Sequence, residues 1–105
     1  MSLKEEKINN IKVMLKELGD IHRNMSKSQL KNDYRRFLYF IQSKKSDFKM
    51  VFLYIEKRIE MFEKSLNMME GIDNKGIVRF WKKIRDIILK TYEKNKDIDR
   101  SINGR

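Results

Sequence analysis

The chain has 105 residues, with 25 Lys and Arg against 15 Asp and Glu and a formal net charge of +10 at pH 7. It contains no Cys, which excludes disulfides, thiolate nucleophiles and every zinc site built on sulfur. A chain of this length accommodates one domain with one modest core, and the absence of Pro together with only four Gly favours an all-α fold.

Two amphipathic helices are predicted in the first part of the chain. Apolar residues at helical spacing predict the first over residues 3–18, with Gly19 as its C-terminal signal. A connector follows, and Ser26 or Ser28 caps a second helix that ends near Ser43. The apolar face of each helix is the side expected to enter a common core.

Two further helices are predicted in the second part. Ser46 or Asp47 caps the third and longest helix, whose apolar stripe continues without a break up to Gly71. A short Gly-containing connector leads to a fourth helix over residues 77–94. Four amphipathic helices with short connections pack most economically as a small bundle.

The predicted domain organisation is one helical domain over residues 1–94 and a flexible basic and polar tail over residues 95–105. The tail is expected to be frayed because its hydrophobicity is low and no apolar period is evident. No stretch approaches the roughly 20 apolar residues of a membrane span, and the N-terminus is charged where a signal peptide needs an apolar segment. We therefore expect a cytoplasmic protein that makes no membrane contact.

The predicted third helix has a second apolar strip, formed by Met50, Tyr54, Met61 and Met68, which projects away from its main stripe. Two interpretations stay open at the level of sequence. Either this helix is the central one of the bundle and is buried on two sides, or the strip is a surface for self-association or for a partner subunit, since adaptable Met and aromatic side chains suit such surfaces.

The excess positive charge is concentrated in two segments. Residues 23–49 hold eight Lys and Arg against two acidic residues, and residues 74–94 hold seven against two. Cations at helical spacing can neutralise successive phosphates, so the residues predicted to contact RNA are Lys27, Lys31, Arg35, Arg79, Lys82, Lys83 and Lys90, with Lys94 on the same helix face. The alternative is a Lys-rich face that is merely solvated.

An exposed aromatic residue accompanies the first of these segments. Tyr39 and Gln42 are predicted on the solvent side of the second helix, beside Arg35. An exposed tyrosine ring offers a stacking platform for an unpaired base.

The sequence contains few residues that could act as catalytic groups. His22 is the only histidine, it falls in a predicted connector, and no nucleophile stands at motif spacing from it. Asp97 and Asp99 have no EF-hand loop around them, and no Gly-rich phosphate loop is present. We expect no catalytic residues, no metal site and no cofactor.

Three short stretches resemble the small helical subunit of Csm-type (type III-A) CRISPR effector complexes. Ser28-Gln29-Leu30-Lys31 is similar to that family's helix start, with Lys31 in place of the usual Arg and Tyr34 where an aromatic is common. Tyr54-Ile55-Glu56-Lys57-Arg58 resembles its Tyr-x-x-x-Arg element, and Arg79-Phe80-Trp81 resembles the Arg-Phe start of its last helix.

The resemblance implies a non-catalytic RNA-binding subunit of an antiviral ribonucleoprotein. Such a subunit stacks along the guide–target RNA duplex, beside other effector-complex subunits and copies of itself, and leaves RNA cleavage to other subunits. The RNA-facing positions that it implies are Lys31, Arg58 and Arg79. The alternative function is a helical protein–protein adaptor or homo-oligomeric scaffold that docks through the Met and Tyr strip.

Overall fold

The computed structural model describes residues 2–43, 47–65 and 74–103. Within these ranges it contains four α-helices and no strand, which confirms the all-α four-helix prediction. The helices are α1 (Leu3–Arg23), α2 (Gln29–Ser43), α3 (Phe48–Ser65) and α4 (Asn74–Asn103). The predicted end of the third helix near Gly71 lies outside the described residues.

Local side-chain caps fix the starts of three helices. The Ser2 side chain accepts a hydrogen bond from the backbone N–H of Glu5, which begins α1 as predicted. For α2 the cap is Ser28 rather than Ser26, because Ser28 Oγ accepts from the N–H of Lys31 at 3.1 Å. Asp47 Oδ1 likewise accepts from the N–H of Met50 at 3.2 Å and begins α3. Each cap satisfies one of the N–H groups that lack a partner within the helix.

The first helix does not end at Gly19. It continues to Arg23 and is capped by the backbone of Asn24, so the predicted connector is largely helical. The physical reason is that Ile21 and Met25 carry the apolar face onward from Leu18 at helical spacing and pack against the core. A helix that gains this burial tolerates one glycine, whose cost is about 1 kcal/mol.

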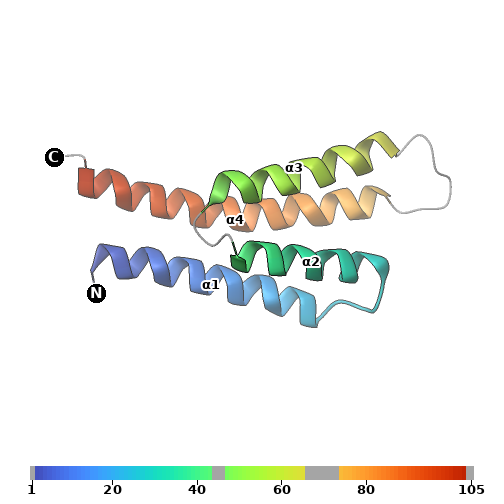
Figure 1. Ribbon diagram of the computed structural model, residues 1–105, viewed down its shortest axis with the longest axis horizontal. Helices are drawn as coiled ribbons and strands as arrows, with labels where there is room; N and C mark the ends of the chain where they lie inside the picture. Colours follow the sequence, from blue (N-terminus) through green and yellow to red (C-terminus); the bar gives the residue numbers. More distant parts are fainter. Residues whose placement is uncertain (1, 44–46, 66–73, 104–105) are drawn as a thin grey trace.

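Figure 1 shows two antiparallel hairpins, one of α1 with α2 and one of α3 with α4, joined by the packing of α1 against α4. Both α1 and α4 therefore have two neighbouring helices. The interpretation that buried the third helix on two sides is wrong, because Met50 and Met61 are 42% and 45% exposed. The outer face of α3 leaves Met50 and Leu53 more than two-fifths exposed. The bundle is elongated, 55 × 26 × 18 Å, because α1 and α4 extend together beyond α2 and α3.

Aromatic side chains occupy the centre of the core. The Trp81 ring is fully buried and meets the rings of Phe37 and Tyr34 edge-on, at centroid distances of 5.4 and 6.1 Å. Tyr34 is also fully buried, and its hydroxyl donates to the carbonyl of Leu18 at 2.6 Å. This bond gives the phenol a partner that replaces water and links α2 to α1.

The expected flexible tail is wrong as far as Asn103, because α4 continues to that residue. Ile98 is only 9% exposed and Asn95 only 5%. Asn10 Nδ2 of α1 donates to Asn95 Oδ1 at 2.9 Å, and Asn95 Nδ2 donates to the carbonyl of Lys7 at 3.3 Å. The contact between α4 and α1 thus continues through Asn95, a polar residue that hydrogen-bonds to α1. A search for apolar residues alone overlooks such a contact.

Candidate nucleic-acid interface

The α2 stripe is defined as Lys27, Lys31 and Arg35. Lys31 and Arg35 lie on α2 beside the end of α1, whereas Lys27, predicted on the same helix, precedes it because α2 begins at Gln29. Lys27 and Arg35 are exposed. Lys31 is half-buried and its Nζ donates to the carbonyl of Met25 at 3.1 Å, which ties the connector to the start of α2. The three residues lie close together in the sequence and contribute positive potential to the start of α2.

His22, near the end of α1, lies close enough to Lys31 and Arg35 for their charges to affect its pKa. Its ring lies beside Tyr34, with 6.0 Å between the centroids. Partial burial lowers the pKa of His22 below 6.5, and the charges of Lys31 and Arg35 lower it further. The lowered pKa favours the neutral form of the ring, and burial is the larger of the two causes.

The α4 stripe, defined as Arg79, Lys83, Lys90 and Lys94, follows α4 for roughly 22 Å at 1.5 Å per residue. All four side chains are exposed. Within the described ranges, none of them forms an ion pair with a carboxylate. Their charge is therefore available to an external anion.

The opposite edge of α4 differs, because its cations are neutralised by α3. Lys82 Nζ lies 3.3 Å from Glu63 Oε1, and Arg85 Nη1 lies 2.8 Å from Glu56 Oε1. Lys82, which the sequence placed among the RNA-contacting residues, thus has an acidic partner that Lys83 lacks. Adjacent lysines on one helix acquire different roles because they point to different neighbours.

Arg58 is held within the bundle. Its guanidinium forms an ion pair with Asp33 of α2 at 2.9 Å and lies 5.4 Å from the centroid of the Tyr54 ring. The Asp33 side chain is 13% exposed and that of Arg58 is 28% exposed. The pair joins α2 to α3, so the structure favours a structural role for Arg58 over the RNA-facing role that the resemblance implies.

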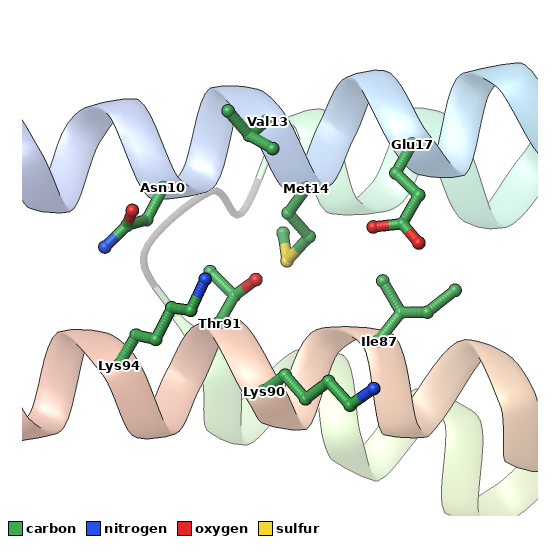
Figure 2. Close-up of a pocket in the computed structure, with 8 residues that line it drawn as sticks. All are labelled: Asn10, Val13, Met14, Glu17, Ile87, Lys90, Thr91 and Lys94. Atoms are coloured by element: carbon green, nitrogen blue, oxygen red, sulfur yellow. The ribbon is translucent and has the colours of Figure 1, made fainter.

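A groove runs along the seam between α1 and α4, with a volume of about 280 Å³ (Figure 2). Lys90 and Lys94 form part of its α4 wall, and Asn10 and Glu17 form part of its α1 wall. The rest of the lining is Val13, Met14, Ile87 and Thr91. Lys90 and Lys94 of the α4 stripe therefore border a concave surface, whereas Arg79 lines a separate hollow with Glu63 and Lys82. This placement requires knowing that α1 lies beside α4.

The two stripes flank α1 on opposite sides. Leu15 and His22 lie on the side of α1 toward α2, and Val13 and Glu17 lie on the side toward α4 at 100° per residue. The exposed face of α1 consequently separates the two cationic edges. An extended polyanion that meets both stripes crosses this face.

The predicted Met and Tyr strip is divided by the structure. Tyr54 is half-buried, with its ring 4.9 Å from that of Phe40 and 5.3 Å from that of Phe37, so it belongs to the margin of the core. Met50 and Met61 are 42% and 45% exposed, and Met68 lies outside the described residues. The sequence missed Leu53, which is 49% exposed; its position three residues after Met50 was the available signal.

Among the residues that the structure describes, no group of three or more His, Asp or Glu side chains is placed to hold a metal ion. No helix in the same ranges is long and apolar enough to cross a membrane. Comparison with known proteins finds no matching family model, no matching curated protein and no matching solved structure. The assignment of the interface therefore depends on its own charges and contacts.

Proposed function

We propose that this protein is a non-catalytic RNA-binding subunit that holds the phosphate backbone of RNA without reading its sequence. The single observation that carries the proposal is the set of four exposed cations of the α4 stripe, which have no carboxylate partner in the described ranges. Exposed cations bind phosphates by releasing condensed counterions, and backbone contacts carry no base information.

The charge distribution among the helices supports the same proposal. Helix α4 holds nine Lys and Arg against four Asp and Glu, whereas α3 holds four against three. The α2 stripe adds three cations at a second location, of which Lys27 and Arg35 are exposed. A cationic surface of two separated edges suits a polyanion broader than one strand, so the proposed ligand is an RNA duplex.

The proposed assembly is a type III CRISPR effector complex. The protein would lie along the guide–target duplex in the cytoplasm, in contact with other effector subunits. Support for this part comes from the three stretches that resemble the small Csm-type subunit. Of their residues, Arg79 is exposed, whereas Tyr34 and Trp81 are core residues and Arg58 pairs with Asp33.

Charge reversal of the α4 stripe tests RNA binding. Lys83→Glu with Lys90→Glu removes two exposed, unpaired cations without touching the core. We expect the affinity for a short mixed-sequence RNA duplex to fall and the salt dependence of binding to become shallower by about two units, one per lost phosphate contact. Fluorescence anisotropy between about 50 and 200 mM salt measures both quantities.

The matched control lies on α3. Lys49→Glu with Lys57→Glu changes the net charge equally, and these two lysines are also exposed and unpaired within the described residues. The control should leave the salt dependence near that of the parent protein. If it weakens binding as much as the α4 variant does, bulk charge explains the binding, and the site assignment is refuted.

A second candidate function, a protein–protein adaptor, is favoured by the exposure of Met50 and Leu53 on α3. A patch of this kind on a monomer marks a contact surface when it is contiguous. Sedimentation of the protein with and without Leu53→Lys tests the self-associating form of this candidate. A monomer at every concentration, unchanged by the substitution, removes it.

A further inference from the structure

Tyr39 is the most exposed of the large apolar side chains in the described ranges, at 66%. It lies on the solvent side of α2, one helical turn from Arg35 and Gln42. No packing in the bundle accounts for an aromatic ring at this position. Its surroundings therefore indicate what it can bind.

The rings of the other three tyrosines in the described chain are buried or lie against a cation. Tyr34 is buried in the core. The guanidinium carbon of Arg58 lies 5.4 Å from the centroid of the Tyr54 ring, and the ammonium nitrogen of Lys96 lies 5.7 Å from that of the Tyr92 ring. Tyr39 differs because, in the parts of the chain that the structure describes, neither another ring nor a cation covers it. The exposed part of this ring is accessible to a planar ligand.

The neighbours of Tyr39 are cationic or hydrogen-bonding. Arg35 and Arg36 lie four and three residues before it, which places them one turn away on the same helix, and both are exposed. The one acidic residue of α2, Asp33, is engaged by Arg58. An aromatic ring beside two free guanidinium groups matches a nucleotide, whose base stacks while its phosphate pairs with a cation.

We propose that Tyr39 is a stacking site for an unpaired nucleobase of the bound RNA, with Arg35 and Arg36 at the adjoining phosphates. The inference rests on the proposed RNA-binding function and adds a contact that reads single-stranded rather than paired nucleotides. A protein partner fits less well, because Tyr39 is the only exposed large apolar side chain of α2, and the core of a protein interface needs a contiguous apolar patch.

The test compares Tyr39→Ala and Tyr39→Phe on three probes of equal length: oligouridine RNA, an abasic sugar-phosphate backbone and an RNA duplex. Tyr39→Ala should weaken oligouridine binding by roughly 5- to 150-fold, the range that stacking of one base gives. It should leave the affinities for the abasic backbone and the duplex unchanged. Tyr39→Phe keeps the ring and should retain the parent affinity on all three probes.

Each outcome separates this inference from the function on which it rests. If the parent protein binds none of the probes at low salt, the RNA-binding proposal fails. If the parent protein binds oligouridine and Tyr39→Ala binds it equally well, the stacking site is overturned while RNA binding stands. An equal loss on the abasic backbone also overturns stacking, because no base is present there.

Discussion

The C-terminal part of α4 provides the sharpest stability prediction, because sequence and structure disagree there. Ile98→Ala removes side-chain carbons from a position that is 9% exposed. If residues 95–103 were a tail, the truncation would cost nothing. In the structure the position is buried, near Asn95 and Asp99, whose side chains bond to α1, so the truncation should destabilise the bundle.

The expected magnitude follows from the burial and from the number of helices around the site. Truncation of a buried Ile to Ala costs about 2–5 kcal/mol in a closed core. Ile98 lies six positions after Tyr92, whose ring is 5.3 Å from that of Phe48 at the start of α3. It therefore lies past the start of α3, and solvent can reach part of the space left behind. The loss should therefore be near the lower limit, about 2 kcal/mol.

Urea unfolding followed by the fluorescence of Trp81 measures this loss. Trp81 is the only tryptophan and is fully buried, so its signal follows the opening of the core. At a slope of 1–3 kcal/mol per M urea, a loss of about 2 kcal/mol moves the midpoint by roughly 1 M. Far-ultraviolet circular dichroism should give the same midpoint if unfolding is two-state.

Leu89→Ala is the matched control. It removes the same number of carbons from the same helix, but at a position that is 38% exposed. The control should shift the midpoint by less than half as much as Ile98→Ala. Equal shifts for the two variants would refute the burial of Ile98 and would support the flexible tail that the sequence predicted from residue 95.

Three further predictions concern the core and the charged contacts. Ile59→Ala should cost about 2–5 kcal/mol in chemical unfolding, because Ile59 is 4% exposed, and Phe62→Ala should cost less than its size suggests because Phe62 is only half-buried. Arg58→Ala leaves the carboxylate of Asp33 without its cation in a largely buried position, so stability should fall by about 1–3 kcal/mol while RNA affinity, measured by anisotropy, should stay at the parent value. Burial and two cations of α2 lower the pKa of His22 in the folded state, so the unfolded chain takes up the proton at a higher pH than the folded chain does. The free energy of unfolding should therefore fall as the pH drops from about 6.5 to the lowered pKa. His22→Gln should flatten this part of a profile of stability against pH.

Helix starts and apolar faces were predictable because their causes are local. Ser2 and Asp47 each bond to an N–H three residues away, and nothing distant is needed for either cap. The stripe around Ile55 and Ile59 follows from spacing alone. These contacts are encoded within a few residues of sequence.

Helix ends were harder to predict because they depend on distant partners. The continuation of α4 is stabilised by Asn10, which lies 85 positions from Asn95 and bonds to it across the seam. Gly19 is a frequent stop signal, yet burial of Ile21 outweighs it. Local propensity gives way to tertiary packing at both places.

The candidate interface was predictable in its cations but not in their pairing. Helical spacing identified Lys83 and Lys90, which the structure leaves exposed and unpaired in the described ranges. The same spacing could not distinguish Lys82, whose partner Glu63 belongs to another helix. The resemblance implied an RNA-facing role for Arg58, and its pairing with Asp33, 25 positions away, was not evident from the sequence.

The unequal neutralisation of α4 makes one edge of this helix more positive than the other. Lys82 and Arg85 are matched by acidic residues of α3, while Lys83 and Lys90 on the other edge are not. A polyanion that approaches this helix is attracted more strongly to the uncompensated edge than to the compensated one. Under the proposed RNA-binding function, the edge that carries Lys83 and Lys90 would therefore meet the RNA first.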